Sequence, residues 1–368
     1  MAAHSNVTFR VFYLWEFGVT ARHDPQFGKT ILWDIDLLSG YDSEFVPNVS
    51  PDPGTHQFAG LDNPELPARL AAWRPTALLL FGYNWKSHLR ALWWARWHRV
   101  PTILRGDSHW LGRGAPAWHR HAALSVLFRQ FAAFLNVGTA NADYYRTLGV
   151  PTEKLFFAPH SVDAARFDPA DFNSQAAAAK LRSELGLTGK RIVLFAGKLH
   201  ERKQPVELLE AFLAVATDEH ALIFVGDGAE RENLLQRAAR APDHHVRFLP
   251  FANQSEMPAR YLLGDLMALP SRGSYETWGL AVNEAMHLGR PCLVSDLVGC
   301  QRDLVIPNHT GWVFSANDTT DLRRTLHEAL HCPSATLAEF SRNCLSQISG
   351  FTYAQTTRGL TDALAQLR

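Results

Sequence analysis

Two glutamates, Glu276 and Glu284, lie eight positions apart around the expected start of a helix near Gly279. An apolar strand, residues 266–270, precedes them. At about 100° per residue, the second carboxylate lies about 80° around the helix axis from the first. The first turn of a helix offers free N–H groups to an anion, whereas a carboxylate there repels phosphate and suits hydroxyl groups. The spacing therefore predicts a site in which backbone amides hold phosphate and the two glutamates hold sugar hydroxyls.

The formal net charge is zero, so the overall charge does not indicate a nucleic-acid partner. The chain has 368 residues, more than one hydrophobic core usually supports, so we expect two domains. The first ten residues lack the apolar core of a signal peptide, and the apolar run at 77–81 is too short to cross a bilayer. Four cysteines without metal-type spacing are expected to be reduced thiols. We expect a cytoplasmic protein, free or peripheral at the inner face of the membrane.

Short apolar strands alternate with helices in both halves, which indicates two doubly wound parallel sheets. We expect an α/β fold of two Rossmann-like domains facing a cleft, residues 1–168 and 169–350, with a helix at 351–368 packing back on the first domain. The expected strands are 7–14, 77–81, 102–104, 133–138, 192–196, 222–225, 246–249, 266–269 and 292–294. Ligands bind beyond the carboxyl ends of such strands, so the loops at 15–28, 82–85 and 105–110 should face the site.

The second half resembles the donor domain of the retaining glycosyltransferases of family four, which have the two-domain GT-B fold. The segments that carry the resemblance occur in the family's order: 157–169 is similar to its interdomain segment, 194–203 to its glycine-then-basic loop, and 224–230, 269–271 and 276–296 to its later motifs. The first half resembles the family only in the alternation of its strands and helices.

The resemblance implies a role for each residue of the second half that matches one of these motifs. Gly197, Lys198 and Lys203 would meet the diphosphate of a nucleoside-diphosphate sugar, although the family usually has Arg at the position of Lys198. Glu276 would hold hydroxyls of the transferred sugar, and Glu284 those of the ribose. The helix start at Thr277, Trp278, Gly279 and Leu280 would lie near the diphosphate, and the loop 250–253 near the nucleobase. A solvated basic turn and a helix with an acidic first turn are the alternatives, but the latter leaves Glu284 unexplained.

The first half departs from the family pattern at two places. Asp107 and His109, after the strand at 102–104, are candidates for contacting the sugar or the acceptor hydroxyl, and a capping Asp and a surface His explain them equally well. The family's paired glycines after the first strand are missing; only Gly18 remains, beside Glu16. Gly18 is the candidate for the phosphate contact from this domain.

We expect no metal and no cofactor beyond the donor itself. Asp34 and Asp36 look like the metal-binding acids of a different glycosyltransferase fold, but GT-B enzymes do not use such a pair. The glycines at 226 and 228 lack the third glycine of a dinucleotide loop. Retention in the family is thought to need no protein nucleophile, since the leaving phosphate helps to deprotonate the acceptor.

Residues 83–129 are basic and rich in tryptophan, with eight Lys or Arg against one acid. The basic, tryptophan-rich helix at 86–99 can lie in a membrane interface. It can equally be a sheet-packing helix whose Leu89, Leu92, Trp93 and Trp97 face the core. Aromatic side chains also stack on sugar rings, so a saccharide acceptor fits the same residues, and a lipid-linked saccharide fits both interpretations.

These observations lead to a retaining, metal-independent hexosyltransferase that moves a sugar from a nucleoside-diphosphate sugar to a glycan or lipid-linked saccharide. A nucleotide-sugar epimerase of the same fold and a catalytically inactive scaffold subunit remain as alternatives. The tryptophan-rich first half argues against the epimerase, and the joint presence of both glutamates and two lysines argues against the scaffold.

Overall fold

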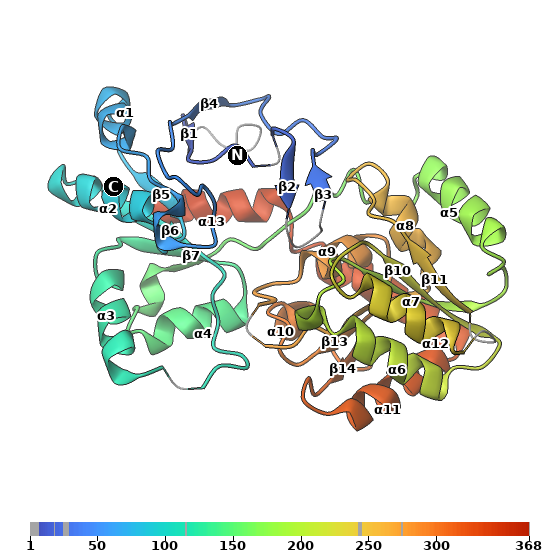
Figure 1. Ribbon diagram of the computed structural model, residues 1–368. Coiled ribbons are helices and arrows are strands. Elements are labelled where there is room, and N and C mark those ends of the chain that lie inside the picture. The colour runs from blue at the N-terminus through green and yellow to red at the C-terminus, as the bar shows by residue number, and fades with distance from the viewer. Residues whose placement is uncertain are drawn as a thin grey trace.

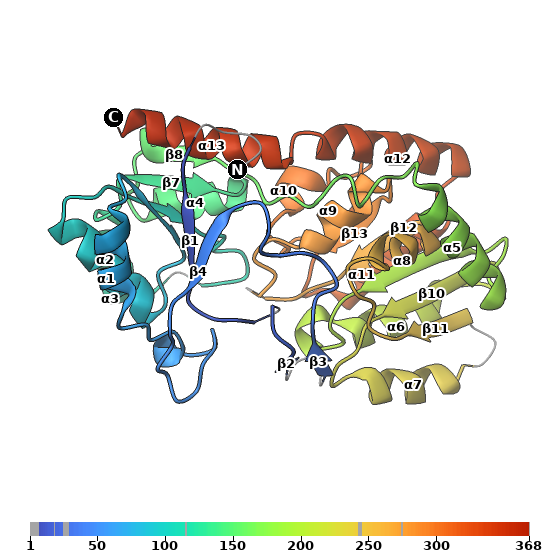
Figure 2. The same ribbon diagram turned by 90° about the horizontal axis from the view of Figure 1, so that it is seen from above.

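The computed structural model describes residues 7–17, 19–24, 29–114, 116–241, 245–273 and 275–367. It has two lobes of helices and sheets, as Figure 1 shows. The N-terminal lobe holds the elements up to residue 157, and the C-terminal lobe those from 172 to 348. The chain then returns, so that its last helix lies on the N-terminal lobe (Figure 2).

The sheet of the N-terminal lobe has four parallel strands, in the order β5 (Leu78–Phe81), β6 (Thr102–Arg105), β7 (Ala133–Asn136) and β8 (Leu155–Phe157). Two further pairs lie outside it: β1 (Arg10–Tyr13) is parallel to β4 (Asp42–Phe45), and β2 (Arg22–Asp24) is antiparallel to β3 (Lys29–Ile31). The helices of this lobe are α1 (Leu66–Trp73), α2 (Lys86–Trp97), α3 (Trp118–Phe128) and α4 (Thr139–Thr147), with 3-10 turns η1 (Phe58–Gly60) and η2 (Thr152–Lys154).

Alternate residues along β6 belong to two different cores. Leu104 packs in the cluster that α1–α4 share, whereas Ile103 packs in a second cluster on the opposite face of the sheet. That second cluster includes Leu360 and Ala363 of α13 (Tyr353–Gln366), the C-terminal helix. A Cβ on Gly359 of α13 would lie only 2.2 Å from the backbone oxygen of Phe157, so the helix sits directly on the sheet edge. The C-terminal helix thus covers the face that α1–α4 leave open.

The C-terminal lobe contains a six-stranded parallel sheet in the order β11-β10-β9-β12-β13-β14. These strands are β9 (Arg191–Ala196), β10 (His220–Val225), β11 (His245–Leu249), β12 (Leu266–Leu269), β13 (Cys292–Ser295) and β14 (Gly311–Phe314). The helices are α5 (Phe172–Glu184), α6 (Pro205–Val215), α7 (Arg231–Ala239), α8 (Met257–Leu263), α9 (Leu280–His287), α10 (Gln301–Leu304), α11 (Thr319–Leu330) and α12 (Ser334–Ile348), and η3 (Glu201–Lys203) is a 3-10 turn. Hydrophobic clusters fill both faces, as expected for a parallel sheet whose strands read as continuous apolar runs.

The α/β fold with two Rossmann-like sheets is confirmed. Sequence reasoning missed the short strands β4, β8 and β14 and the helix α4, whose lengths of three to nine residues give too little periodicity to recognise.

The expectation that Trp93 and Trp97 face the core is wrong. Helix α2 buries a seam of small residues four positions apart, Ser87, Ala91 and Ala95, together with Leu92. Residues two positions apart on a helix are separated by about 200° around its axis. Trp93 and Trp97, each two positions after a residue of the seam, therefore lie on the opposite side of the helix. Trp97 is 84% exposed. In the part of the chain that the structure describes, none of the helices is long and apolar enough to cross a membrane.

Candidate functional site

The order of the C-terminal sheet reverses between β9 and β12, and the loops that follow these two strands lie side by side. β10 and β11 extend the sheet on one side, and β13 and β14 on the other. The carboxyl ends of the strands at such a reversal form the usual ligand site of an open α/β sheet. The site is therefore built by the loop 197–203 after β9 and the segment 270–279 after β12.

The loop after β9 is shaped by close contact with the loop after β10. A Cβ on Gly226 would lie 2.0 Å from the backbone oxygen of Gly197, which no side chain could accommodate. The φ angles of Gly197 and Gly226 are 149° and 140°, a conformation that favours glycine. The glycine that the sequence predicted as a donor contact thus also brings the two loops together.

Lys203 and Glu276, predicted from distant motifs, form a direct ion pair. Lys203 Nζ lies 2.6 Å from Glu276 Oε2, and Ser271 Oγ donates to the same oxygen at 2.9 Å. Both charged side chains are largely buried. The side chain of Lys203 lies against Gly197: a Cβ on Gly197 would be 3.5 Å from Lys203 Cδ. The pair holds a carboxylate and an ammonium group in fixed positions at the reversal of the sheet.

The other basic residues of this loop are placed less centrally. Lys198 is half-buried on the same turn. The Arg202 guanidinium lies 3.4 Å from the centre of the Tyr275 ring. Arg202 therefore has an aromatic partner at the rim, and the carboxylate of Glu276 is paired with Lys203.

Helix α9 begins where the sequence predicted, with Gly279 as its N-cap and Leu280 partly exposed in its first turn. Glu284, one turn further, accepts a hydrogen bond from Tyr261 Oη at 2.6 Å. Burial raises the pKa of Glu284 to about 7, although Tyr261, Arg166 and Lys203 act in the opposite direction. Glu284 is therefore a carboxyl group that changes charge near neutral pH.

The side chains of Thr277 and Trp278 point away from the donor loops and contact the N-terminal lobe. Thr277 Oγ1 donates to Asp107 at 2.8 Å. Trp278 is buried, donates from its indole to Asn283 Oδ1 at 2.7 Å, and lies where a Cβ on Gly138 would clash at 2.5 Å. A role at the donor is thus left to the backbone N–H groups of these residues.

Asp107 and His109 both bridge the lobes. Burial raises the pKa of Asp107, but the hydrogen bonds from His160 and Thr277 outweigh it and hold that pKa below its usual range. His109 is only 1% exposed, so the surface-histidine interpretation is wrong.

The tautomer of His109 follows from its two partners. Its Nδ1 accepts from the Leu111 N–H at 3.1 Å, so its Nε2–H donates to the carbonyl of Glu276 at 3.3 Å. Burial lowers the pKa of His109 and keeps it neutral. His109 therefore links its own loop, through Nδ1, to the segment that carries Glu276, through Nε2.

The predicted nucleobase loop also meets the N-terminal lobe. Asn253 Nδ2 donates to the carbonyl of Leu32 at 2.8 Å, and the Trp33 ring lies 6.1 Å from that of Phe251. Asp34, one of the two acids that resemble a metal pair, accepts from Ser255. Asp36 instead accepts from the amides of its own turn. Within the described residues, no group of three or more His, Cys, Asp or Glu is arranged to hold a metal ion.

Several site residues escaped the sequence analysis. Ser271, Tyr261 and His160 lie against the predicted glutamates and Asp107. Ser271 and His160 lie inside segments that carried the resemblance, whereas the position of Tyr261 on α8 gave no signal. The predicted Gly18 lies outside the described residues.

Comparisons with known proteins find similarity to glycosyltransferases. The family model described as "Glycosyl transferases group 1" matches residues 178–345. A D-inositol 3-phosphate glycosyltransferase of Salinispora arenicola is 27% identical over 90% of this chain and 83% of its own length. An alpha-D-kanosaminyltransferase of Streptomyces kanamyceticus is 30% identical over 44% of this chain and 42% of its own.

Solved structures show the same fold. Anabaena HepE in complex with UDP superposes with a TM-score of 0.69 and 18% identity over 89% of this chain and 87% of that one. The sucrose-phosphate synthase of Thermosynechococcus elongatus gives a TM-score of 0.69 and 20% identity over 90% and 85% of the two chains. At these identities the likeness concerns the GT-B fold alone.

The contact between Asp303 and the first turn of α4 is predicted to hold the lobes together. Asp303 accepts from the N–H of Thr139 at 3.0 Å and from its hydroxyl at 2.6 Å. Asp303→Ala should lower stability by about 1–2 kcal/mol, the usual loss of a helix cap, and should increase the radius of gyration measured by small-angle X-ray scattering.

Asp318→Ala is the matched control, because Asp318 caps α11 inside the C-terminal lobe through the N–H groups of Thr320 and Asp321. It should lower stability similarly and leave the radius unchanged. An unchanged radius in Asp303→Ala would show that this contact does not hold the lobes.

Proposed function

We propose that the chain, whose residues 178–345 match the group 1 glycosyltransferase family model, is a retaining, metal-independent enzyme. It transfers a hexosyl group from a nucleoside-diphosphate sugar to a saccharide or lipid-linked saccharide acceptor. The observation that carries the proposal is the ion pair between Lys203 and Glu276 at the reversal of the sheet, with Glu284 one turn into helix α9. One cation and two carboxylates at this place support a site for a diphosphate, a sugar and a ribose.

The donor is held by complementary groups at each part. The diphosphate lies against the loop 197–203 and the free N–H groups of the first turn of α9, where the helix dipole favours negative charge. The Lys203 ammonium stabilises the charge that develops on the leaving diphosphate. Glu276 accepts from hydroxyls of the transferred sugar, and Glu284 accepts from those of the ribose.

The chemistry requires little of the protein beyond positioning. The bond between the sugar C1 and the leaving phosphate oxygen breaks, the acceptor oxygen bonds to C1 on the same face, and its proton passes to that phosphate oxygen. Asp107 and His109 supply no nucleophile in this scheme. Asp107 Oδ2 meets His160 and Thr277, and the ring nitrogens of His109 are engaged with Leu111 and Glu276. Their role is to position the Glu276 segment against the acceptor lobe.

Radiolabelled UDP-glucose, incubated with and without a lipid extract, tests the transfer. Nucleotide release that depends on the extract supports transfer, whereas an epimerised sugar without release would indicate the epimerase.

Glu276→Ala is expected to lower turnover about 100-fold by removing a contact to the reacting sugar. Glu284→Ala is expected to weaken donor binding about tenfold or more, since it removes a charged hydrogen-bond acceptor. A panel of nucleotide sugars that all fail to bind would rule out the proposal.

Donor affinity is predicted to depend on pH through Glu284. The pKa of this group in the free protein is about 7, and only its ionised form accepts from both ribose hydroxyls. Affinity should therefore be constant above pH 7 and should fall by up to about tenfold per pH unit below it. Calorimetric titration with UDP-glucose between pH 5.5 and 8.5 measures this effect, because the diphosphate of a nucleotide sugar does not titrate there. Glu284→Gln should bind more weakly and without this slope; a slope that persists would assign it to another group.

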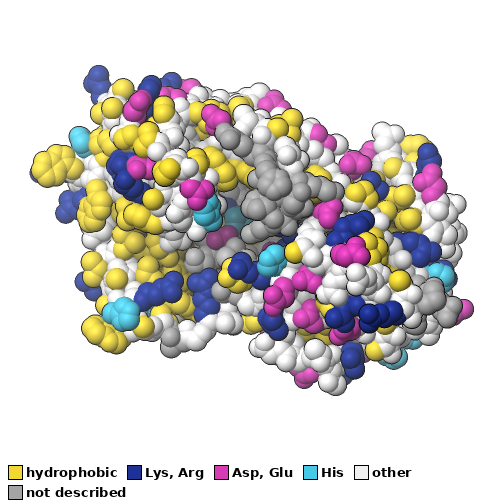
Figure 3. Space-filling model, viewed as in Figure 1, with side chains coloured by type: hydrophobic (Ala, Val, Ile, Leu, Met, Phe, Trp, Pro, Cys, Tyr) yellow, Lys and Arg dark blue, Asp and Glu magenta, His cyan; other side chains and the backbone are white. Residues whose placement is uncertain are grey.

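The tryptophans of α2 and α3 support a peripheral contact with an anionic membrane. Trp97 and Trp118 are 84% and 82% exposed. Arginines 96, 99, 120 and 129 lie on or next to the same two helices. Figure 3 shows hydrophobic side chains among Lys and Arg on the side of the N-terminal lobe. Exposed indoles next to cationic groups suit the headgroup region of a bilayer.

Vesicle co-sedimentation tests this membrane contact. The protein should bind vesicles that contain phosphatidylglycerol and not vesicles of phosphatidylcholine alone. Replacing Trp97 and Trp118 by Ala should weaken binding on the order of tenfold. Phe172→Ala is the control, because Phe172 is similarly exposed on α5 of the other lobe. Equal binding by both variants would contradict the proposed surface.

A further inference from the structure

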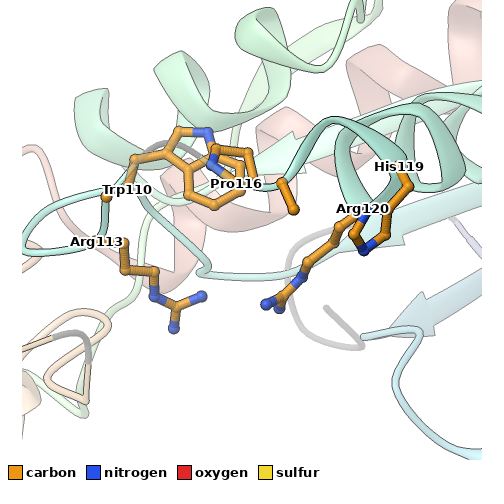
Figure 4. Close-up of a pocket in the computed structure, with 7 residues that line it drawn as sticks. Trp110, Arg113, Pro116, His119 and Arg120 are labelled. Carbon is orange, nitrogen blue, oxygen red and sulfur yellow. The ribbon is translucent and has the colours of Figure 1, made fainter.

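A cavity of about 720 Å³ lies in the N-terminal lobe between the loop after β6 and the start of α3. Its wall includes Trp110, Arg113, His119 and Arg120. Figure 4 shows the guanidinium groups of Arg113 and Arg120 extending toward the same open space, with Trp110 and Pro116 behind them. None of the described residues that line the cavity is an acid. The volume is within the range of small-molecule sites.

The loop that lines one side of the cavity also reaches the C-terminal lobe. Trp110 directly follows His109, whose ring donates to the carbonyl of Glu276. A Cβ on Gly112 would lie 3.0 Å from Leu297 Cδ1 and 3.5 Å from the Cα of Gly273, so this loop touches the C-terminal lobe. The loop that lines the cavity is thus in contact with the segment of the C-terminal lobe that carries Glu276.

The ring of Trp110, which forms the aromatic wall of the cavity, is fixed by contacts with helix α4. The Trp110 indole donates to Thr147 Oγ1 at 2.8 Å, and its ring centre lies 4.8 Å from that of Tyr144. His121 contacts the carbonyl of the same Thr147 at 2.8 Å, which ties α3 to α4. Trp110 therefore presents a fixed ring face, the kind of surface on which a sugar ring stacks.

The charge of the cavity favours an anion. Arginine side chains bind phosphate through paired N–H donors, and two of them can hold one phosphate from both sides. Within the described residues, Arg120 forms no ion pair with a carboxylate. Helix α3, of eleven residues, has Ala117 as its N-cap, which offers no side-chain acceptor to the N–H groups of the first turn. The positive end of α3 adds to the field of the two guanidinium groups.

We propose that this cavity binds a phosphate group carried by the acceptor, with Arg113 and Arg120 as the phosphate ligands and Trp110 as the platform for the adjoining sugar or polyol ring. The proposal rests on the transferase function and specifies its acceptor as a phosphorylated saccharide or polyol. The phosphate can be the monoester of a soluble sugar phosphate or the diester of a lipid headgroup. The same cavity chemistry serves both.

Binding measurements with matched probes test the cavity without knowledge of the natural acceptor. The full-length protein, saturated with UDP, is titrated calorimetrically with glucose 6-phosphate and with glucose. Vesicles of phosphatidylcholine with and without phosphatidylinositol form the lipid arm. We expect a phosphorylated probe to bind and its neutral counterpart not to bind. Arg113→Ala and Arg120→Ala should each weaken that binding about tenfold or more, as expected for loss of a charge-assisted contact to phosphate.

Arg129→Ala is the control, because Arg129 caps the other end of α3 and does not line the cavity. It should leave the binding of glucose 6-phosphate unchanged. All three variants should keep the wild-type affinity for UDP-glucose. Equal binding of charged and neutral probes, no binding of either phosphorylated probe, or full binding by both cavity variants would overturn the proposal. Loss of UDP-glucose binding in the wild-type protein would instead contradict the transferase function itself.

Discussion

The structure depends at its centre on Glu276, which joins the two loops of the donor site and both lobes. Its carboxylate accepts hydrogen bonds from Lys203 in the loop after β9 and from Ser271 just after β12. Its backbone carbonyl accepts hydrogen bonds from His109 of the N-terminal lobe and from the N–H of Gly299. A carboxylate can accept about four hydrogen bonds, and within the described residues the donors to Glu276 fall on Oε2. The other oxygen is therefore the one that can meet a substrate hydroxyl without breaking the contacts that hold the residue.

How much the sequence predicts depends on whether a feature is local. Strands β10 and β12 are fully buried and β9 nearly so, so they read as apolar runs and were placed within a few residues. Lys203 and Glu276 could be placed near one another because loops after β9 and β12 meet wherever a doubly wound sheet reverses. The directions of the Thr277 and Trp278 side chains could not be predicted, since they are set by Asp107 and Gly138 of the other lobe. Trp97 was misplaced for a related reason: hydrophobicity alone does not show that a seam of small residues fits the sheet better.

The contacts between the lobes are mostly polar. Asp303 with Thr139, Arg302 with Asp143, and Asn253 with Leu32 are hydrogen bonds or ion pairs at partly exposed positions. Groups of this kind regain hydrogen bonds to water when they separate, so parting them costs far less than parting an apolar core. One exception is Trp278, which is buried between Gly138, His160 and Phe351. The lobes thus have a buried apolar contact next to the site and a largely polar, reversible periphery around it.

The pairing of Lys203 with Glu276 changes what each residue can contribute to donor binding. An ammonium group already balanced by a carboxylate attracts a diphosphate less than an isolated one, because the carboxylate repels the same phosphate. The attraction must then come largely from backbone N–H groups at the start of α9, which carry no counter-charge. In return, Lys203 and Ser271 fix the orientation of the carboxylate before any substrate arrives. Under the proposed function, Lys203 is thus a positioning residue for Glu276 as well as a phosphate ligand, and the site gains a preorganised acceptor for sugar hydroxyls in exchange for part of its phosphate affinity.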